Sequence, residues 1–118
     1  MNTYDIAMLA AKTCLAKKGR DVLILDIGEK SSFADYFVLA SGPNERLIEA
    51  ISDEVGDALA KQGIFPKNIE GKRTSGWILM DFEDVIISVF TTEMRDRYNI
   101  EKVWGDCRAI EVNDDTEE

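Results

Sequence analysis

Histidine is absent from the 118 residues of this chain, and cysteine and proline occur only twice each. Without histidine, the chain lacks the residue most often used as a general base and as a metal ligand. Cys14 and Cys107 show no metal-type spacing, and we expect both to be free thiols that behave as small apolar residues. No apolar run approaches the roughly 20 residues that cross a bilayer. We therefore expect no metal centre, no cofactor and no membrane contact.

Acidic residues outnumber basic ones by 23 to 14, which gives a net charge of −9. This charge opposes binding along the phosphate backbone of DNA. It suits a basic protein partner, because opposite potentials speed encounter. The alternative is that acidity only keeps the protein soluble, and charge alone does not decide. Residues 1–20 lack the basic start and cleavage site of a secretory signal, so we expect a cytoplasmic protein.

The length of the chain is enough for one compact domain and too short for two ordinary ones. We expect a single domain over residues 1–112. Residues 113–118 contain four carboxylates, at Asp114, Asp115, Glu117 and Glu118, and are expected to form an acidic, flexible tail.

Apolar periodicity and turn residues predict elements in the order α-β-β-α-β-β-α-β. The predicted helices cover residues 3–18, 44–62 and 92–104, and the predicted strands cover 22–27, 36–40, 77–82, 85–90 and 107–112. The link at Glu83 and Asp84 is so short that its two strands must form an antiparallel hairpin. Residues 64–75 are expected to be a connection. The elements predict an α/β fold with a mixed sheet of about five strands flanked by helices.

Particular residues mark the expected ends of the helices. Gly19 is expected to end the first helix in a left-handed conformation, and Gly63 to end the second. Ser41 and Asn44 are both candidates to cap the start of the second helix. Asn99 is expected to interrupt the third.

Five stretches of the sequence match, in order and with correct gaps, the motifs of one bacterial family. They are D-Y-F-V at Asp35–Val38, a helix ending in D-E-V at Arg46–Val55, the pair Glu70–Gly71, W-x-x-x-D at Trp77–Asp81, and the spacing of Val89–Phe90, Glu93, Arg95, Tyr98, Glu101 and Trp104. The chain resembles the Iojap-like ribosomal silencing factors over about residues 21 to 112. The resemblance implies a nucleotidyltransferase-like core.

Four positions depart from the family pattern. Ser88 stands where histidine usually precedes the V/I-F pair, and Arg97 stands where an aromatic residue is common. Ile100 and Val103 replace the two leucines of an L-E-x-L-W motif and keep their apolar character. A role that depends on the usual histidine is therefore not expected here.

The resemblance also implies a mechanism that uses no cofactor and no turnover. Members of the family bind ribosomal protein fourteen of the large ribosomal subunit, on the face that meets the small subunit. Their presence blocks subunit association and represses translation when nutrients are short. For this chain the resemblance thus implies a translational repressor and not an enzyme.

Trp77, Leu79 and Asp81 alternate onto one face of their predicted strand, and the residues between them point to the other face. Exposed apolar area that includes tryptophan is typical of a binding interface. With the resemblance added, we predict that these three residues contact the partner. The alternatives are that Trp77 is a core residue packed under a helix and that Asp81 only starts the turn.

Arg95, Tyr98, Glu101 and Trp104 follow one another at spacings of three and would form one stripe on a helix. We predict that Arg95, Tyr98 and Trp104 also contact the partner. The alternative is a structural ion pair between Arg95 and Glu101, flanked by two aromatic side chains that pack on the sheet.

Two further interpretations concern other partners and activities. Lys67, Lys72 and Arg73 form a small basic cluster that would make a minor contact with ribosomal RNA, although exposed cations in a loop are usually only solvated. The hairpin face could also form the interface of a symmetric homodimer.

The strongest rival function is a metal-dependent nucleotidyltransferase-like enzyme. Ser41–Gly42 before the second helix, with the carboxylates of Asp81, Glu83 and Asp84, would supply the parts of such a site. Against this interpretation, the last two carboxylates lie at a hairpin tip, and the sequence has no glycine-rich loop followed by lysine.

Overall fold

The computed structural model describes residues 1–29, 31–32 and 34–112, so the expected acidic tail at 113–118 lies outside the described residues. The elements are α1 (Thr3–Ala16), β1 (Arg20–Asp26), β2 (Tyr36–Gly42), α2 (Glu45–Ala60), β3 (Asn68–Glu70), the 3-10 turn η1 (Arg73–Ser75), β4 (Trp77–Asp81), β5 (Val85–Thr91), α3 (Thr92–Tyr98), α4 (Ile100–Val103) and β6 (Arg108–Ile110). They form a sheet of six strands in the order β3-β4-β5-β2-β1-β6.

The sheet is mixed, as the sequence predicts. β2 and β5 are parallel at its centre, and every other neighbouring pair is antiparallel. The predicted hairpin is confirmed in β4 and β5, where Trp77 lies opposite Phe90 and Leu79 opposite Ser88. The predicted α/β class is therefore confirmed.

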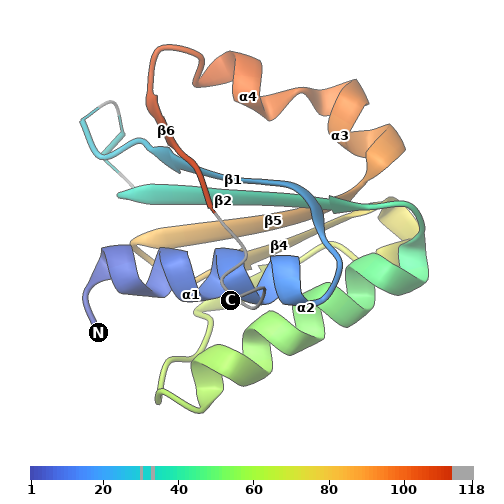
Figure 1. Cartoon of the computed structure of the whole chain (residues 1–118), viewed down its shortest axis with the longest axis horizontal. Coiled ribbons are helices and arrows are strands. Elements are labelled where there is room, and N and C mark those ends of the chain that lie inside the picture. Colours follow the sequence, from blue (N-terminus) through green and yellow to red (C-terminus); the bar gives the residue numbers. More distant parts are fainter. Residues whose placement is uncertain (30, 33, 113–118) are drawn as a thin grey trace.

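Helices cover the two faces of this sheet unequally (Figure 1). α1 and α2 lie along one face, where their apolar stripes and the strands form the larger core cluster. α3 and α4 lie on the opposite face. There a smaller cluster forms around Leu25, Phe37, Leu39 and Phe90. Because α3 and α4 are short, β4 and β3 at one end of this face are only partly covered, and Leu79 stays half-buried.

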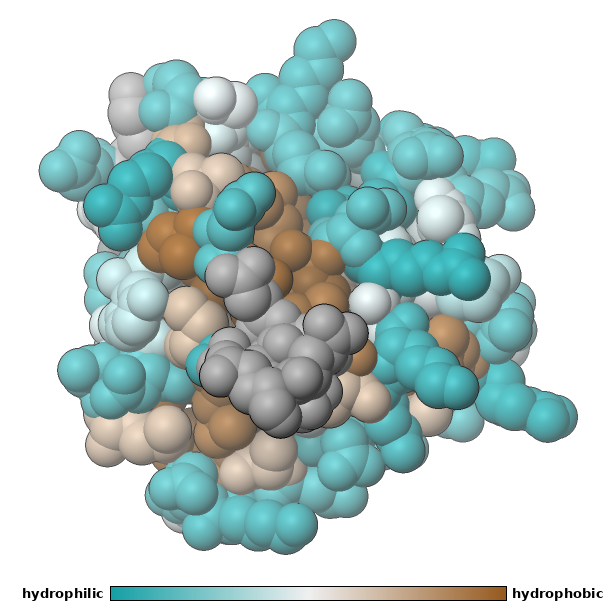
Figure 2. All heavy atoms as spheres, viewed as in Figure 1, coloured by the Kyte–Doolittle hydropathy of each residue, from teal (hydrophilic) through white to brown (hydrophobic). Residues whose placement is uncertain are grey.

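The surface seen from the side of α1 and β6 is mostly hydrophilic. Figure 2 shows apolar side chains near the middle of this side, with hydrophilic side chains around them. None of the helices in the described part of the chain has the length and apolar character that a membrane crossing requires.

Two details of the chain path differ from the expectation. The segment 64–75, expected to be a connection, contains β3 and η1, and β3 pairs with β4 as a sixth strand. The left-handed residue after α1 is Lys18, with φ 68°, and not Gly19. Gly19 is needed for a different reason, because a Cβ there would lie 2.7 Å from the carbonyl oxygen of Cys14.

The other helix-end predictions are confirmed. Asn44 caps α2, since its side chain accepts a hydrogen bond from Leu47 N at 2.8 Å. Ser41 instead is buried and donates its hydroxyl to Arg20 O at 3.1 Å. Gly63 follows α2 with φ 77°, and Asn99 breaks the last helix with φ 44°.

Candidate partner-binding site

Trp77 lies half-buried between two other aromatic rings. Its ring stacks on Phe90 with a centroid distance of 5.0 Å and an interplanar angle of 27°. Tyr98 from the end of α3 is equally close, at 5.0 Å and a 48° tilt. Since Phe90 is buried and Tyr98 is 48% exposed, Trp77 joins the core on one side and reaches the surface on the other.

Ser88 fixes the orientation of this indole. The Nε1–H of Trp77 donates a hydrogen bond to Ser88 Oγ at 3.1 Å. Ser88 is fully buried on the same face of the sheet, directly opposite Leu79 in the register. Ser88 was not among the residues predicted for the site, although it replaces the histidine that is usual in the family.

An apolar pocket of about 220 Å³ opens beside Trp77. Its walls come from β3, the turn around η1, β4 and the end of α3, and its lining residues are Glu70, Gly71, Ser75, Trp77, Leu79 and Tyr98. The structure thus brings together three predicted residues, Trp77, Leu79 and Tyr98. The other three lie in the segment that was expected to be only a connection, although Glu70–Gly71 was one of the matching motifs.

Gly71 and Ser75 hold the loop against the start of β4. Gly71 has φ 84°, and a Cβ on it would collide with the carbonyl oxygen of Trp77. Ser75 Oγ lies 2.7 Å from Lys72 O and 3.0 Å from Trp77 O, within hydrogen-bonding distance of both. These contacts bring the loop close enough to β4 to form one wall of the pocket.

Asp81 lies at the opposite end of β4 from Trp77. Its Oδ1 accepts a hydrogen bond from Glu83 N at 2.8 Å. This bond stabilises the hairpin turn, where Glu83 adopts a φ of 78°. The carboxylate is half-buried and takes part in the turn, as the alternative interpretation expected, while its contact with the partner stays a prediction.

Arg95 is buried, with 7% of its surface exposed. Its Nε and Nη2 donate to the two carboxylate oxygens of Glu101 at 2.9 and 3.2 Å. These hydrogen bonds hold the pKa of Glu101 below its usual value. The structural ion pair, which was the alternative interpretation, is therefore present.

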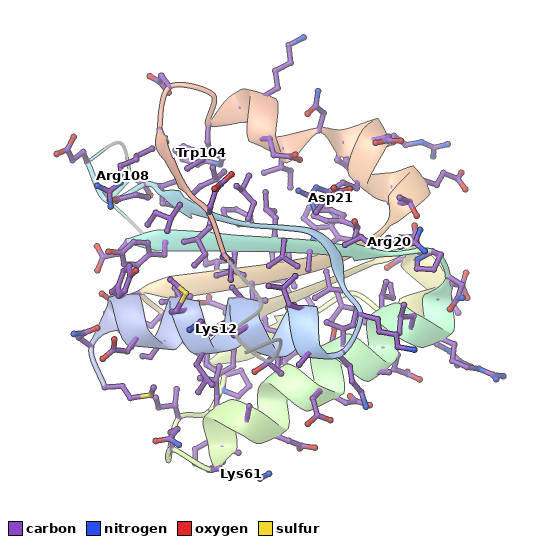
Figure 3. All side chains as sticks on the ribbon, viewed as in Figure 1. Lys12, Arg20, Asp21, Lys61, Trp104 and Arg108 are labelled. Carbon is purple, nitrogen blue, oxygen red and sulfur yellow. The ribbon has the colours of Figure 1, made fainter. Side chains whose placement is uncertain are left out.

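Trp104 and Tyr98 lie in different surroundings. Trp104 packs against the smaller core cluster and lies between α4 and β1 (Figure 3). Because Asn99 breaks the helix after Tyr98, Trp104 does not continue the stripe that Arg95 and Tyr98 form on α3, and that part of the prediction is wrong. Tyr98 alone of these three reaches the Trp77 pocket.

The carboxylates proposed for the rival enzyme are arranged as turn residues. Glu83 and Asp84 form the exposed tip between β4 and β5. Within the described ranges, no group of three or more acidic, histidine or cysteine side chains is placed to hold a metal ion.

A comparison with protein families matches all of residues 1–118 to the model of the ribosomal silencing factor during starvation. The chain belongs to this family. Its relatives include the ribosomal silencing factor RsfS of Bacillus subtilis, which is 39% identical over 113 residues that cover 96% of both proteins. Family membership makes the chain a regulatory factor with a role in ribosome silencing.

More distant relatives and solved structures agree with this assignment. A crystal structure of a protein from Chromobacterium violaceum superposes with a TM-score of 0.85 and 30% identity, and covers 89% of this chain and 88% of that one. A mouse protein named mitochondrial assembly of ribosomal large subunit protein 1 is 28% identical over 104 residues, which are 86% of this chain and 45% of the mouse protein. Sequence similarity to this chain therefore extends beyond bacterial proteins.

Proposed function

We propose that this ribosomal silencing factor binds the large ribosomal subunit through ribosomal protein fourteen and blocks association with the small subunit. It represses translation sterically, in the cytoplasm, without catalysing a reaction or using a cofactor. Membership of the silencing-factor family supports this proposal, and so does the mouse relative that is named for the large subunit. The proposed binding unit is the single domain of residues 1–112.

The observation that carries the proposal is the half-exposed Trp77 held between Phe90 and Tyr98 beside an apolar pocket. Tryptophan and tyrosine are the residues most enriched among interface hot spots. Both the stacking on Phe90 and the hydrogen bond to Ser88 restrict the indole before any partner arrives. A side chain that is already ordered loses little conformational entropy on binding, so more of its contact energy contributes to affinity.

The charge of the protein fits a basic partner. The net charge is −9, and the carboxylate of Glu70 lines the pocket beside the two aromatic rings. Proteins that bind ribosomal RNA carry many lysines and arginines, which an acidic surface attracts over a distance. The pocket would therefore combine apolar contact with an attractive electrostatic field.

The candidate residues take different parts in this proposal. Trp77, Leu79 and Tyr98 make the central contact, and Asp81 at the end of β4 offers a carboxylate to a donor on the partner. Arg95 and Trp104 act mainly by holding α3 and α4 on the sheet. A minor contact of Lys72 and Arg73 with ribosomal RNA is compatible with their exposed positions beside the pocket.

A pull-down with purified large subunits, and separately with isolated ribosomal protein fourteen, tests the proposed partner. Leu79→Ala and Tyr98→Ala remove pocket walls, and Val103→Ala removes an apolar side chain that is 72% exposed outside the pocket. We expect wild type and Val103→Ala to be retained equally, and each pocket variant to bind about tenfold more weakly. If the wild type binds neither large subunits nor ribosomal protein fourteen, the proposed partner is wrong. If Val103→Ala loses as much binding as the pocket variants, the proposed binding face is wrong.

The oligomeric state can be tested on the same variants. A homodimer through the hairpin face would cover the pocket and compete with the ribosome. A light-scattering concentration series on wild type and Tyr98→Ala distinguishes this case, because only the wild type would then gain mass with concentration.

A further inference from the structure

β3 forms the edge of the sheet beside the Trp77 pocket. It pairs with β4 on one side, and within the described residues the sheet has no strand on its other side. The terminal strand of a sheet presents backbone N–H and C=O groups that can pair with a further strand. Natural proteins often protect such an edge with charge, but the middle residue of β3 is Ile69, which is 54% exposed. β3 is thus open both to backbone pairing and to apolar contact.

An apolar pocket lies beside β3 on each face of the sheet. The Trp77 pocket lies on the face that carries α3 and α4. A second pocket, of about 370 Å³, lies on the face covered by α2 (Figure 1), and its apolar lining comes from Ile69, Ile78 and Met80. Gly71, directly after β3, lines both pockets. The two pockets therefore flank the same edge of the sheet.

The register of β3 and β4 explains why these pockets lie on opposite faces. Ile69 pairs with Met80, and Glu70 pairs with Leu79. Successive side chains of a strand point to opposite faces, so Ile69 belongs to the α2 face and Glu70 to the Trp77 face. A strand added beside β3 would alternate in the same way. Two successive side chains of that strand would then lie beside the two pockets.

The charges beside this edge favour an uncharged occupant. The lining of the α2-side pocket includes two carboxylates and two cations, namely Glu49, Asp53, Lys72 and Arg73. Arg73 and Glu49 form an ion pair at 3.5 Å. Because these charges balance, and because Glu70 adds a negative charge on the other face, a phosphate backbone gains no net attraction here. Apolar side chains on an extended backbone match both the pocket linings and the free edge.

We propose that β3 docks an extended, uncharged segment of a protein partner, which adds a further strand to the six-stranded sheet. The backbone of the segment pairs with the free edge of β3. One apolar side chain enters the Trp77 pocket, and the next enters the pocket between α2 and β4. In this mode of recognition, backbone pairing supplies affinity and the pockets for alternate side chains supply specificity. This docking mode goes beyond the proposed function, because it adds a second pocket and a backbone contact and holds for any protein that supplies the strand.

An NMR titration of the full chain, labelled with ¹⁵N, tests this docking mode without ribosomes. The probe is the peptide Ser-Thr-Leu-Val-Thr-Ser, acetylated and amidated at its ends. One control peptide has the same sequence with every backbone amide N-methylated, and the other has serine in place of leucine and valine. We expect saturable shifts at residues 67–71 and 77–80 with the probe only. Exchange of the edge-facing amide protons of β3 should slow about tenfold at about 90% occupancy, because these protons then exchange only from the free chain.

Two variants at opposite edges of the sheet form a matched pair. Ile69→Lys places a charge beside the α2-side pocket, and Ala109→Lys places the same charge in the middle of β6, the other edge strand. Both positions are exposed, so both variants should keep their fold, which their own spectra report. We expect Ile69→Lys to bind the probe about tenfold more weakly, and Ala109→Lys to bind it as the wild type does.

Three outcomes would overturn this docking mode. Without saturable shifts, β3 does not accept a strand. Equal binding of the N-methylated peptide would mean that the pockets take side chains without backbone pairing, and equal loss in the two variants would mean that the probe does not select the β3 edge. Failure here would leave the proposed function intact, because the pull-down with large subunits tests that function separately.

Discussion

Trp77 donates its indole N–H to the hydroxyl of Ser88 at 3.1 Å, across the hairpin formed by β4 and β5. The two residues are not directly opposite each other, because Trp77 pairs with Phe90 and Ser88 with Leu79. The bond therefore runs diagonally over the face that carries the proposed contact. It links a position that departs from the family pattern to the residue on which the proposed function depends.

The variant Ser88→Ala should loosen this indole. It removes the only protein acceptor that the structure shows for Trp77 Nε1 within the described residues. The indole of Trp77 stays half-buried but has no acceptor for its N–H. We expect a loss of about 1 kcal/mol in the free energy of unfolding, measured with urea. The indole N–H resonance of Trp77 should also move upfield. An unchanged resonance would show that the hydrogen bond does not exist in solution.

Gly63 and Gly71 have similar positive φ values, so substituting each with alanine distinguishes the cost of backbone strain from the cost of a steric collision. Gly63 has φ 77° and nothing within 4 Å of an added Cβ, whereas Gly71 has φ 84° and an added Cβ meets the carbonyl of Trp77. Gly63→Ala should cost about 1–2 kcal/mol of stability from backbone strain alone. Gly71→Ala should cost a further 1 kcal/mol or more, about the range for overpacking, and should weaken partner binding. If chemical denaturation shows the same loss of unfolding free energy for Gly63→Ala and Gly71→Ala, the loop at Gly71 moves freely away from β4.

The ion pair of Arg95 and Glu101 predicts a dependence of stability on pH. The pKa of Glu101 is lowered in the folded state because Arg95 donates hydrogen bonds to it. Its contribution is therefore fully present above the usual pKa of a glutamate and is lost as the pH falls through the lowered value. Because the Glu101 side chain is 37% exposed, water screens part of the interaction. Glu101→Gln should therefore destabilise the protein by about 1 kcal/mol at pH 7, and this difference from the wild type should shrink at acidic pH. Denaturation curves of both proteins from pH 7 to 3 measure this difference in stability. A difference that stays constant over this range would show that Arg95 does not lower the pKa of Glu101.

The sequence predicts the hairpin, both long helices and the central strands, because their signals are local. Apolar alternation and helical spacing are visible within each segment. β3 was missed because its three residues, Asn68–Glu70, are all exposed and show no alternation. It becomes a strand only by pairing with β4, which lies further along the chain. In the same way, the position of the left-handed turn at Lys18 depends on how closely Gly19 approaches Cys14.

The sequence predicts that Trp77 and Leu79 share a face, but it does not predict the contacts of Ser88, Arg95 and Glu101 around them. Alternation along one strand places Trp77 and Leu79 on the same face, and the structure agrees. The role of Ser88 follows from the diagonal contact between two strands, which a single segment does not reveal. The spacing of Arg95 and Glu101 allowed two interpretations, and only the break at Asn99 shows why their side chains turn toward each other.

The two cysteines should differ in reactivity. Cys14 is fully buried, and burial raises the pKa of its thiol to about 12. Cys107 is half-buried near the end of the described chain. Iodoacetamide at pH 8 should therefore alkylate Cys107 and spare Cys14 in the folded protein, because only an accessible thiolate reacts. Mass spectrometry of the digested protein identifies the labelled residue, and rapid labelling of Cys14 would indicate that α1 opens readily.

The most direct test of steric repression is a subunit-joining assay, in which purified small and large ribosomal subunits are mixed and joined ribosomes are measured by light scattering. We expect the wild-type chain to lower the joined fraction in proportion to its concentration, up to one chain for each large subunit. The double variant Leu79→Ala, Tyr98→Ala, shown to be folded by circular dichroism, should leave joining near the level seen without any factor. If the wild type binds large subunits and joining is unchanged, or if the double variant inhibits as strongly as the wild type, steric repression through the Trp77 pocket is wrong.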